Sequence, residues 1–418
     1  NEDIRSLPDK VAIQLNDTHP SIAIPELMRL LVDEHDIDWD ISWDITRESM
    51  AYTNHTLLPE ALECWTVELL EHLLPRHLEI IYEINHHFLE EIRQNYPDEG
   101  FINSVSIIQE GPVKMVRMAH LAIVGSHSVN GVAALHTKLL KHHVMPELYR
   151  IFPKRFNNKT NGVTPRRWLK QANPSLSLLI SDNLGSAWVR DLDQLEGLHN
   201  LADDPGFRES WRGSKLSNKI VLADYLSKQQ NITVDPESMF DVQVKRIHEY
   251  KRQLLNLLRV IGYYIRLKEG EIRNPVSRTV IIGGKAAPSY VQAKLIIKLA
   301  CAVGDVVNSD PQVNKVLKVV FLENYGVSQA ERIFPASDLS EQISTAGLEA
   351  SGTGNMKFAM NGALTIGTMD GANIEIMEAV GKENIIIFGL SADEIMAKKH
   401  NGYSGSEYVD NNPLLAQV

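Results

Sequence analysis

Cysteine is scarce in this chain of 418 residues, and its scarcity excludes two classes of protein. Only Cys64 and Cys301 occur, which is too few for a disulfide framework or for a cysteine-rich metal site. This usage is typical of proteins in a reducing compartment. We therefore expect a cytoplasmic location.

Long apolar runs and an excess of basic residues are also missing. No apolar run approaches the ~20 residues that a membrane-spanning helix needs, and the N-terminus lacks a basic region followed by an apolar core. The 42 Lys and Arg residues are outnumbered by 53 Asp and Glu residues, which gives a formal net charge of −11. We therefore expect neither a membrane partner nor a nucleic-acid partner.

Several familiar catalytic motifs are absent as well. The segment Gly283–Lys285 lacks the spacing and the Ser or Thr of a nucleotide-binding P-loop. No His-Glu-x-x-His motif occurs, and the pairs His86-His87 and His142-His143 lie on predicted helices, where adjacent residues face different directions. We expect no metal site.

The length indicates two or three hydrophobic cores, since single cores stop growing at about 250 to 300 residues. The segment Phe152–Pro165, rich in Asn, Lys, Gly and Pro, is the predicted hinge, so we expect one domain over residues 1–160 and another over 161–418.

The N-terminal part is predicted to be mainly helical, with a first strand, a second strand-like run and one turn. The predicted helices are 24–35, 46–51, 61–96 (broken at Pro75) and 133–149. The predicted strands are 11–15 and 120–124, and a turn is predicted at 125–131.

After Phe240 short apolar strands alternate with long amphipathic helices. That rhythm predicts the α/β class with a doubly wound, mostly parallel sheet, whose ligands bind at the carboxyl ends of the strands. The predicted strands are Asp241–Val244, Thr279–Ile282, Val316–Phe321, Ala363–Ile366 and Asn384–Phe388, and the helices between them include Leu254–Leu267 and Tyr290–Val303.

The most informative motif is the glycine-rich segment Glu349–Lys357. Gly352 and Gly354 permit close backbone approach, and a helix that begins near Asn355 offers unpaired N–H groups to an anion. Lys357 is then a candidate for a Schiff base with a phosphate-bearing cofactor. A flexible loop with a solvated lysine is the alternative.

A cationic segment follows the first strand of the C-terminal part. Lys245, Arg246, His248, Lys251 and Arg252 fall within eight residues at a strand-to-helix junction. Cations at a helix N-terminus oppose the helix dipole, so the placement indicates bound anions, and two adjacent phosphates would suffice. A solvated basic face is the alternative.

Three further motifs allow a structural and a functional interpretation. Asn158–Trp168 either lines a cleft or starts a helix at Pro165 with Thr164 as its cap. Asn16–Pro20 ends the first predicted strand and is either part of a site or a simple Asp or Thr cap. Gly125–Gly131 places His127 in a turn, where a lone histidine is more often structural.

Taken together, these motifs resemble the α-glucan phosphorylases, the glycogen, starch and maltodextrin phosphorylase family. The segments that carry the resemblance, in order along the whole chain, are Leu15–Pro20, Gly125–Gly131, Asn158–Trp168, Asp241–Gln253, Gly283–Pro288, Asp338–Gly347 and Glu349–Lys357. The resemblance implies two facing Rossmann-like domains of the GT-B type. It also implies that this chain, which starts at Asn1, is a fragment with an incomplete first domain and a truncated second domain.

The resemblance also implies roles for individual residues. Lys357 would form the Schiff base with pyridoxal 5'-phosphate, Lys245 and the backbone around Thr353 and Gly354 would hold its phosphate, and Tyr325 and Trp168 would pack near its ring. Arg246 and Lys251 would bind the substrate phosphate and, with Lys245 and His127, form the catalytic group. The sugar would contact His127, Asn161, Glu349, Ser351, Gly352, Tyr250 and His248, with Asp17 and His19 toward the same cleft.

The implied reaction is phosphorolysis of an α-1,4-glucan by inorganic phosphate, which gives α-D-glucose 1-phosphate with retained configuration. The cofactor's phosphate would act as the proton shuttle, and the whole protein would form a homodimer. Two alternatives stay open: a sugar-nucleotide glycosyltransferase of the same architecture, and a glucan-binding or scaffold piece without activity. The preferred glucan, the regulation and the activity of the fragment itself do not follow from the sequence.

Overall fold

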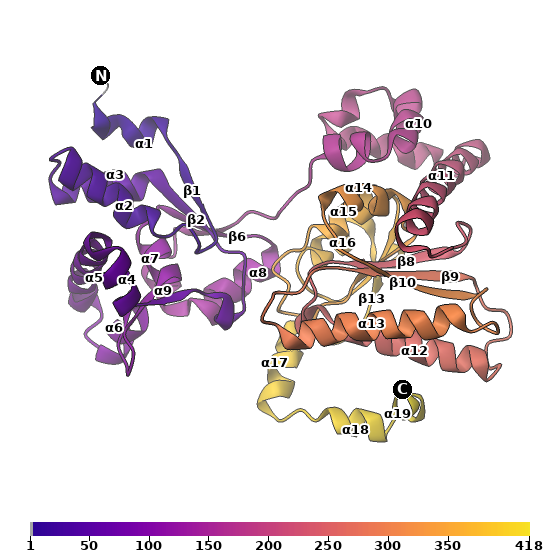
Figure 1. Cartoon of the computed structure of the whole chain (residues 1–418). Coiled ribbons are helices and arrows are strands. Elements are labelled where there is room, and N and C mark those ends of the chain that lie inside the picture. Colours follow the sequence, from indigo (N-terminus) through magenta and orange to yellow (C-terminus); the bar gives the residue numbers. More distant parts are fainter. Residues whose placement is uncertain (1–2) are drawn as a thin grey trace. The chain divides into compact units, whose positions relative to one another are not determined.

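The computed structural model describes residues 3–418, which divide into two compact units (Figure 1). The first unit extends to Asn161 and includes the short segment Gly347–Ser351. The second unit comprises Gly162–Ala346 and Gly352–Val418. Each unit has hydrophobic clusters of its own.

The first unit is built on a parallel sheet in the order β1-β2-β6-β7. Leu15 and Tyr52 from this sheet and Ile24 from α2 are almost fully buried in its core. The strands are β1 (Ile13–Asn16), β2 (Met50–Thr53), β6 (Ser128–Gly131) and β7 (Phe156–Asn158). Its helices are α1 (Leu7–Lys10), α2 (Ala23–Arg29), α3 (Trp39–Ser49), α7 (Met118–Val124), α8 (Ala134–Leu139) and α9 (Pro146–Ile151), with π-helical turns at Leu30–Glu34 and Leu140–Val144.

A helical subregion and a small antiparallel sheet complete the first unit. The sheet has the order β3-β5-β4, from β3 (Cys64–Thr66), β5 (Met115–Arg117) and β4 (Ile108–Gln109). The helices are α4 (Val67–Leu73), α5 (Pro75–Asn95) and α6 (Glu99–Val105). Pro75 starts α5, as expected for a residue without an N–H group, and this confirms the predicted break.

The second unit contains a six-stranded parallel sheet in the order β10-β9-β8-β11-β12-β13. The chain moves outward from β8 through β9 to β10 and then returns to the other side of β8 as β11, so the strand order reverses between β8 and β11. The strands are β8 (Met239–Val244), β9 (Arg278–Gly283), β10 (Leu317–Leu322), β11 (Leu339–Gln342), β12 (Leu364–Gly367) and β13 (Ile386–Ile387).

Helices cover both faces of this sheet (Figure 1). Val280 and Ile282 of β9 face α12 and α13, whereas Val242 and Ile281 face α11, α14 and α15. This confirms the α/β class with doubly wound parallel strands. The helices are α10 (Pro174–Leu184), α11 (Pro205–Gln230), α12 (Gln253–Lys268), α13 (Val291–Ser309), α14 (Val327–Ala336), α15 (Gly354–Met360), α16 (Asn373–Val380), α17 (Ala392–His400), α18 (Gly405–Asp410) and α19 (Pro413–Gln417).

Four local predictions in the first unit were wrong. The helix predicted at 61–96 contains strand β3 at Cys64–Thr66, and α4 begins only at Val67. The run 120–124 is part of helix α7, not a strand, because a short apolar run that is buried on all sides has no periodicity to distinguish the two. The helix predicted at 46–51 ends at Ser49, and Met50 starts β2. The turn predicted at 125–131 is strand β6 from Ser128 onward, since its backbone pairs with strands on both sides.

Two findings concern the predicted exclusions. No helix among residues 3–418 combines the length and apolarity that crossing a membrane requires. Cys64 and Cys301 are both free and exposed.

Candidate active site

The second unit brings the predicted cationic segment next to Gln342 where its strand order reverses. Lys245 directly follows β8, and Gln342 ends the neighbouring strand β11. The Lys245 Nζ atom donates to the Gln342 Oε1 atom at 2.9 Å. In open α/β sheets such a reversal, at the carboxyl ends of the strands, is where ligands bind.

Three hydrogen bonds hold the cationic segment in place. Gln253 donates to the Arg246 carbonyl at 3.0 Å, and the Arg252 Nε atom donates to the Ile343 carbonyl at 2.6 Å. The amide of Thr345 donates to the Tyr250 carbonyl at 2.8 Å, so the loop after β8 is bonded to the loop after β11. This attachment keeps the cations at one edge of the sheet.

The start of helix α12 differs from the simple junction that the sequence suggested. A 3₁₀ turn at Glu249–Lys251 comes first, and Arg252 adopts a left-handed conformation with φ of 58° before α12 begins at Gln253. The predicted cations therefore lie in a folded loop before the helix. His248 packs against Tyr250 in a tilted arrangement and against Tyr290 edge-on, with ring centroids 4.8 Å apart in each pair.

A packing requirement at Gly284 accounts for the Gly283-Gly284 pair, which does not fit a P-loop. A Cβ atom at this position would lie 2.1 Å from the Lys245 carbonyl oxygen, so no other residue fits without moving the backbone. The Ile247 amide also donates to the Lys285 carbonyl at 3.0 Å. The glycine is therefore required for the close packing of the loops that follow β8 and β9.

Lys357 is half-buried on α15, as the glycine-rich motif predicted. Its Nζ atom lies 4.3 Å from the centroid of the Trp168 ring and 3.2 Å from the Thr353 Oγ1 atom. Burial, followed by the charge of Arg167, lowers the pKa of Lys357 below its ordinary value. A larger fraction of this amine is therefore unprotonated and nucleophilic at a given pH.

The Trp168 ring is fixed beside this lysine. Asn361 donates to the backbone carbonyls of both Trp168 and Lys357, at 2.8 and 2.9 Å. The Phe334 ring meets Trp168 edge-on, with centroids 5.5 Å apart. Tyr325, which follows β10, is partly buried against the same hydrophobic cluster, and burial raises its pKa to about 12.

Gln342 also approaches the start of α15. A Cβ atom placed on Gly354 would lie 3.7 Å from the Gln342 Nε2 atom, so this side chain lies between Lys245 and the first residue of α15. Gly352, one of the predicted sugar contacts, has φ of 72°, which favours glycine. Sequence reasoning missed Gln342, because strand β11 is short and polar and so shows no apolar pattern that would predict it as a buried strand.

The other predicted residues belong to the first unit. Asp17 and His19 follow β1, and Asn161 follows β7, so all three lie at the carboxyl edge of the first sheet. Asp17 accepts from the Thr18 amide at 3.0 Å, and the His19 Nδ1 atom lies 3.1 Å from the Glu63 Oε2 atom. Glu349 and Ser351 are within the segment that belongs to this unit.

His127 lies at the opposite edge of the first sheet. It precedes β6, and its Nδ1 atom is 3.3 Å from the carbonyl of Arg47, the residue two positions before the end of α3. The histidine at the carboxyl edge is His55, which follows β2 and bonds to the Asn16 side chain. The adjacent Asn54 bonds to His136 at 2.9 Å. The signal that sequence reasoning overlooked was an Asn-His pair directly after a strand.

The fold and this geometry define an α/β protein with a candidate ligand site where the strand order reverses, and comparison with known proteins identifies its family. The chain matches the carbohydrate phosphorylase family over residues 1–418, and it belongs to that family. It is 56% identical over 414 residues to glycogen phosphorylase, muscle form, from Oryctolagus cuniculus and equally so to that from Homo sapiens. It is 55% identical over 419 residues to the glycogen phosphorylase of Synechocystis sp..

These alignments cover 99% of this chain for the two mammalian proteins and 100% for the bacterial one, but 49% of each relative. The chain therefore spans about half the length of the curated relatives it matches.

The lowered pKa of Lys357 can be tested by chemical labelling. With acetic anhydride over a series of pH values from about 6 to about 10, acetylation of Lys357 should reach half of its maximum at a lower pH than acetylation of the exposed Lys154. Mass spectrometry of the peptides measures both residues in one sample. Coincident profiles, or a higher midpoint for Lys357, would contradict the effect of burial.

Proposed function

We propose that the protein catalyses phosphorolysis of α-1,4-glucans to α-D-glucose 1-phosphate with retained configuration, and that this chain supplies the site for pyridoxal 5'-phosphate. The observation that carries the proposal is the arrangement around Gln342, which contacts Lys245 and lies beside the first residue of α15, the helix of Lys357. The names of the relatives support the same activity.

The residues of the second unit fit this cofactor. The cofactor needs an amine for its aldehyde, a flat surface for its ring and a cation for its phosphate. Lys357 offers an amine with a lowered pKa, Trp168 offers its indole face, and Lys245 offers a cation. The predicted contributions of Tyr325 and of the backbone around Thr353 and Gly354 are part of this proposal.

Arg246 and Lys251 would bind the substrate phosphate in this proposal. Both lie in the loop that begins with Lys245, and cations so close together favour the dianionic form of a phosphate. When bound, the cofactor would supply a phosphate monoester with a second pKa near 6, which can share a proton with inorganic phosphate at neutral pH. Lys245, Arg246 and Lys251 would stabilise the negative charge as that proton moves.

Candidate sugar contacts lie on each unit. His248, Tyr250 and Gly352 contribute from the second unit, and Glu349 and Ser351, which belong to the first unit, contribute from the loop that precedes α15. From the first unit we retain Asp17, His19 and Asn161, and we place His55 in the role that sequence reasoning gave to His127. The reason is its position at the carboxyl edge, beside Asn16.

The environment of Lys357 favours this proposal over transfer from a sugar nucleotide. A nucleotide-sugar enzyme has no use for a half-buried amine whose pKa is lowered next to an aromatic face. Homodimerisation and a cytoplasmic location stay predictions for the whole protein.

Attachment of the cofactor gives the first test. After incubation with pyridoxal 5'-phosphate and reduction with borohydride, mass spectrometry should find the pyridoxyl group on Lys357. Lys215 is the matched control, because burial also lowers its pKa, in its case to about 8, but its amine is bonded to the Ser337 and Asn361 carbonyls. Label on Lys215, or none on Lys357, would contradict the assignment.

Loss of one cation should weaken phosphate binding. In the chain carrying pyridoxal 5'-phosphate, Lys251→Ala should raise the dissociation constant for inorganic phosphate about tenfold or more, the scale of one charged hydrogen bond. Lys298→Ala, the same charge change at an exposed position of α13, should leave it unchanged. Calorimetric titration measures both, and equal effects would remove Lys251 from the site.

The two histidines make opposite predictions for sugar binding. His55→Ala should weaken binding of glucose 1-phosphate by about threefold to tenfold, as expected for one lost hydrogen bond. His127→Ala should leave it unchanged, because its side chain lies at the amino edge of the sheet. The reverse result in the same titration would restore His127 to the site.

A further inference from the structure

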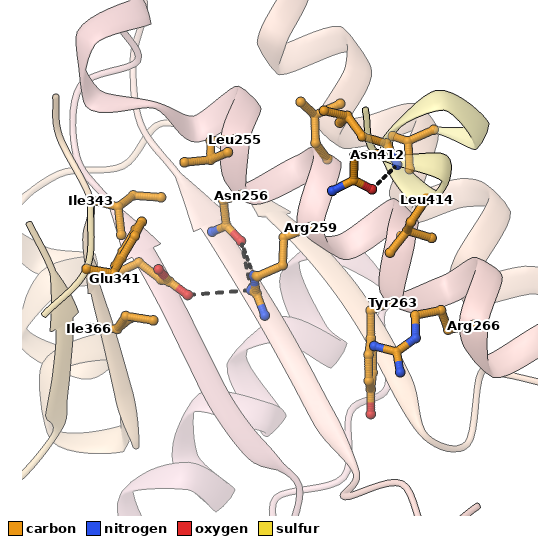
Figure 2. Close-up of a pocket in the computed structure, with 15 residues that line it drawn as sticks. Leu255, Asn256, Arg259, Tyr263, Arg266, Glu341, Ile343, Ile366, Asn412 and Leu414 are labelled. Atoms are coloured by element: carbon orange, nitrogen blue, oxygen red, sulfur yellow. Dashed lines mark hydrogen bonds and ion pairs between the residues drawn. The ribbon is translucent and has the colours of Figure 1, made fainter. Parts of the chain in front are cut away.

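An ion-pair cluster with buried carboxylates lies on the face of the sheet opposite Gln342. Figure 2 shows two of its members, Glu341 and Arg259. Gln342 bonds to Ser340 on one face of β11, so Glu341 between them points to the other face. There Asp241 accepts from Arg259 at 2.7 Å and from Arg278 at 2.8 Å, and Arg259 lies 3.5 Å from Glu341. Asp241 is fully buried and Glu341 is 3% exposed.

Arg259 is held in place by this cluster. Asp241 accepts from both arginines, whereas Glu341 approaches only Arg259. Burial, and next the charge of Asp241, raise the pKa of Glu341. Arg259 and Glu341 line a cavity of about 530 Å³, together with Asn256 and apolar side chains such as Ile343 and Ile366.

A chain of side-chain amides runs from Arg259 to the cationic loop. The Arg259 Nη2 atom donates to the Asn256 Oδ1 atom at 2.7 Å, and Asn256 Nδ2 donates to Gln243 Oε1 at 2.9 Å. Gln243 Nε2 then donates to the backbone carbonyl of Lys251 at 3.1 Å. Asn256 is 1% exposed and Gln243 is fully buried.

The direction of these hydrogen bonds is set at the arginine. A guanidinium only donates, so Asn256 must turn its oxygen to Arg259 and its NH₂ group to Gln243. Gln243 must then turn its oxygen to Asn256 and its own NH₂ group to the Lys251 carbonyl. Because that carbonyl only accepts, the chain is satisfied in one orientation alone.

We propose that Asn256 and Gln243 are positioning residues for the phosphate site, because they connect the backbone of Lys251 to the ion-pair cluster behind the sheet. The inference rests on the proposed function of Lys251. Neither residue would touch phosphate; together they would fix the loop from which the Lys251 side chain extends. A residue needed only for folding would affect stability and leave phosphate affinity unchanged.

Asn256→Asp tests the direction of the chain. Aspartate has the same shape and still accepts from Arg259, but it has no NH₂ group for Gln243. Gln243 must then turn its own NH₂ group toward position 256, which brings its oxygen against the Lys251 carbonyl. In the chain carrying pyridoxal 5'-phosphate, the dissociation constant for inorganic phosphate should rise about threefold to tenfold, the effect of one hydrogen bond, and Lys357 should still take up the pyridoxyl label.

Three further variants separate positioning from charge and from stability. Asn256→Ala and Gln243→Met break the same chain without adding charge, and each should weaken phosphate binding to a similar extent. Asn308→Ala is the matched control: Asn308 lies on α13 and exchanges two hydrogen bonds with the Val319 backbone, at 2.8 and 3.0 Å, away from the Lys251 loop. It should lower the denaturation midpoint and leave phosphate affinity unchanged.

The outcomes distinguish this inference from the proposed function. If the parent chain binds phosphate and the Asn256 and Gln243 variants bind it equally well, the positioning role is wrong and the function stands. The same conclusion holds if Asn308→Ala weakens phosphate binding as much as they do. If the parent chain, loaded with cofactor, does not bind phosphate, both proposals are overturned.

Discussion

The hydrogen bond between Lys245 and Gln342 marks the point on which the rest of the second unit depends. It joins the ends of β8 and β11, the two strands between which the strand order reverses. The loops after both strands are bonded to each other, and α15 begins beside Gln342. In a parallel sheet without this reversal, the loops that follow the strands would not meet at a defined position. The reversal between β8 and β11 places the cationic segment next to the start of α15, the helix that carries Lys357.

The two faces of this sheet contribute to the candidate site through different interactions, aromatic packing on one face and hydrogen bonds on the other. On the face of α11, α14 and α15, the Lys357 amine lies beside the rings of Trp168 and Phe334, and burial lowers the pKa of the amine. On the face of α12, a chain of polar groups, buried except at Arg259, reaches from Asp241 to the Lys251 carbonyl. Burial thus lowers the pKa of the Lys357 amine, and hydrogen bonds of defined direction hold the loop that contains Lys251.

The sequence predicted what depends on apolar periodicity or on a dense motif. The strands near 241, 279, 317 and 364 and the helix at Lys357 are where those patterns placed them. Strand β11 was missed because its buried residues Ser340, Glu341 and Gln342 are polar, and their burial follows from partners distant in the sequence. For the same reason sequence reasoning missed Gln342 and preferred His127 to His55: which edge of a sheet a residue occupies depends on where the strand begins.

The central claim is that Lys245 and Lys357 hold one cofactor while the following cations hold a second phosphate. The most direct measurement is a crystal structure of the chain with pyridoxal 5'-phosphate and inorganic phosphate bound. The account predicts the cofactor ring against Trp168, its phosphate within hydrogen-bonding distance of Lys245 Nζ, and the second phosphate at Arg246 and Lys251. A cofactor phosphate bound away from Lys245, or an inorganic phosphate bound away from this loop, would contradict it.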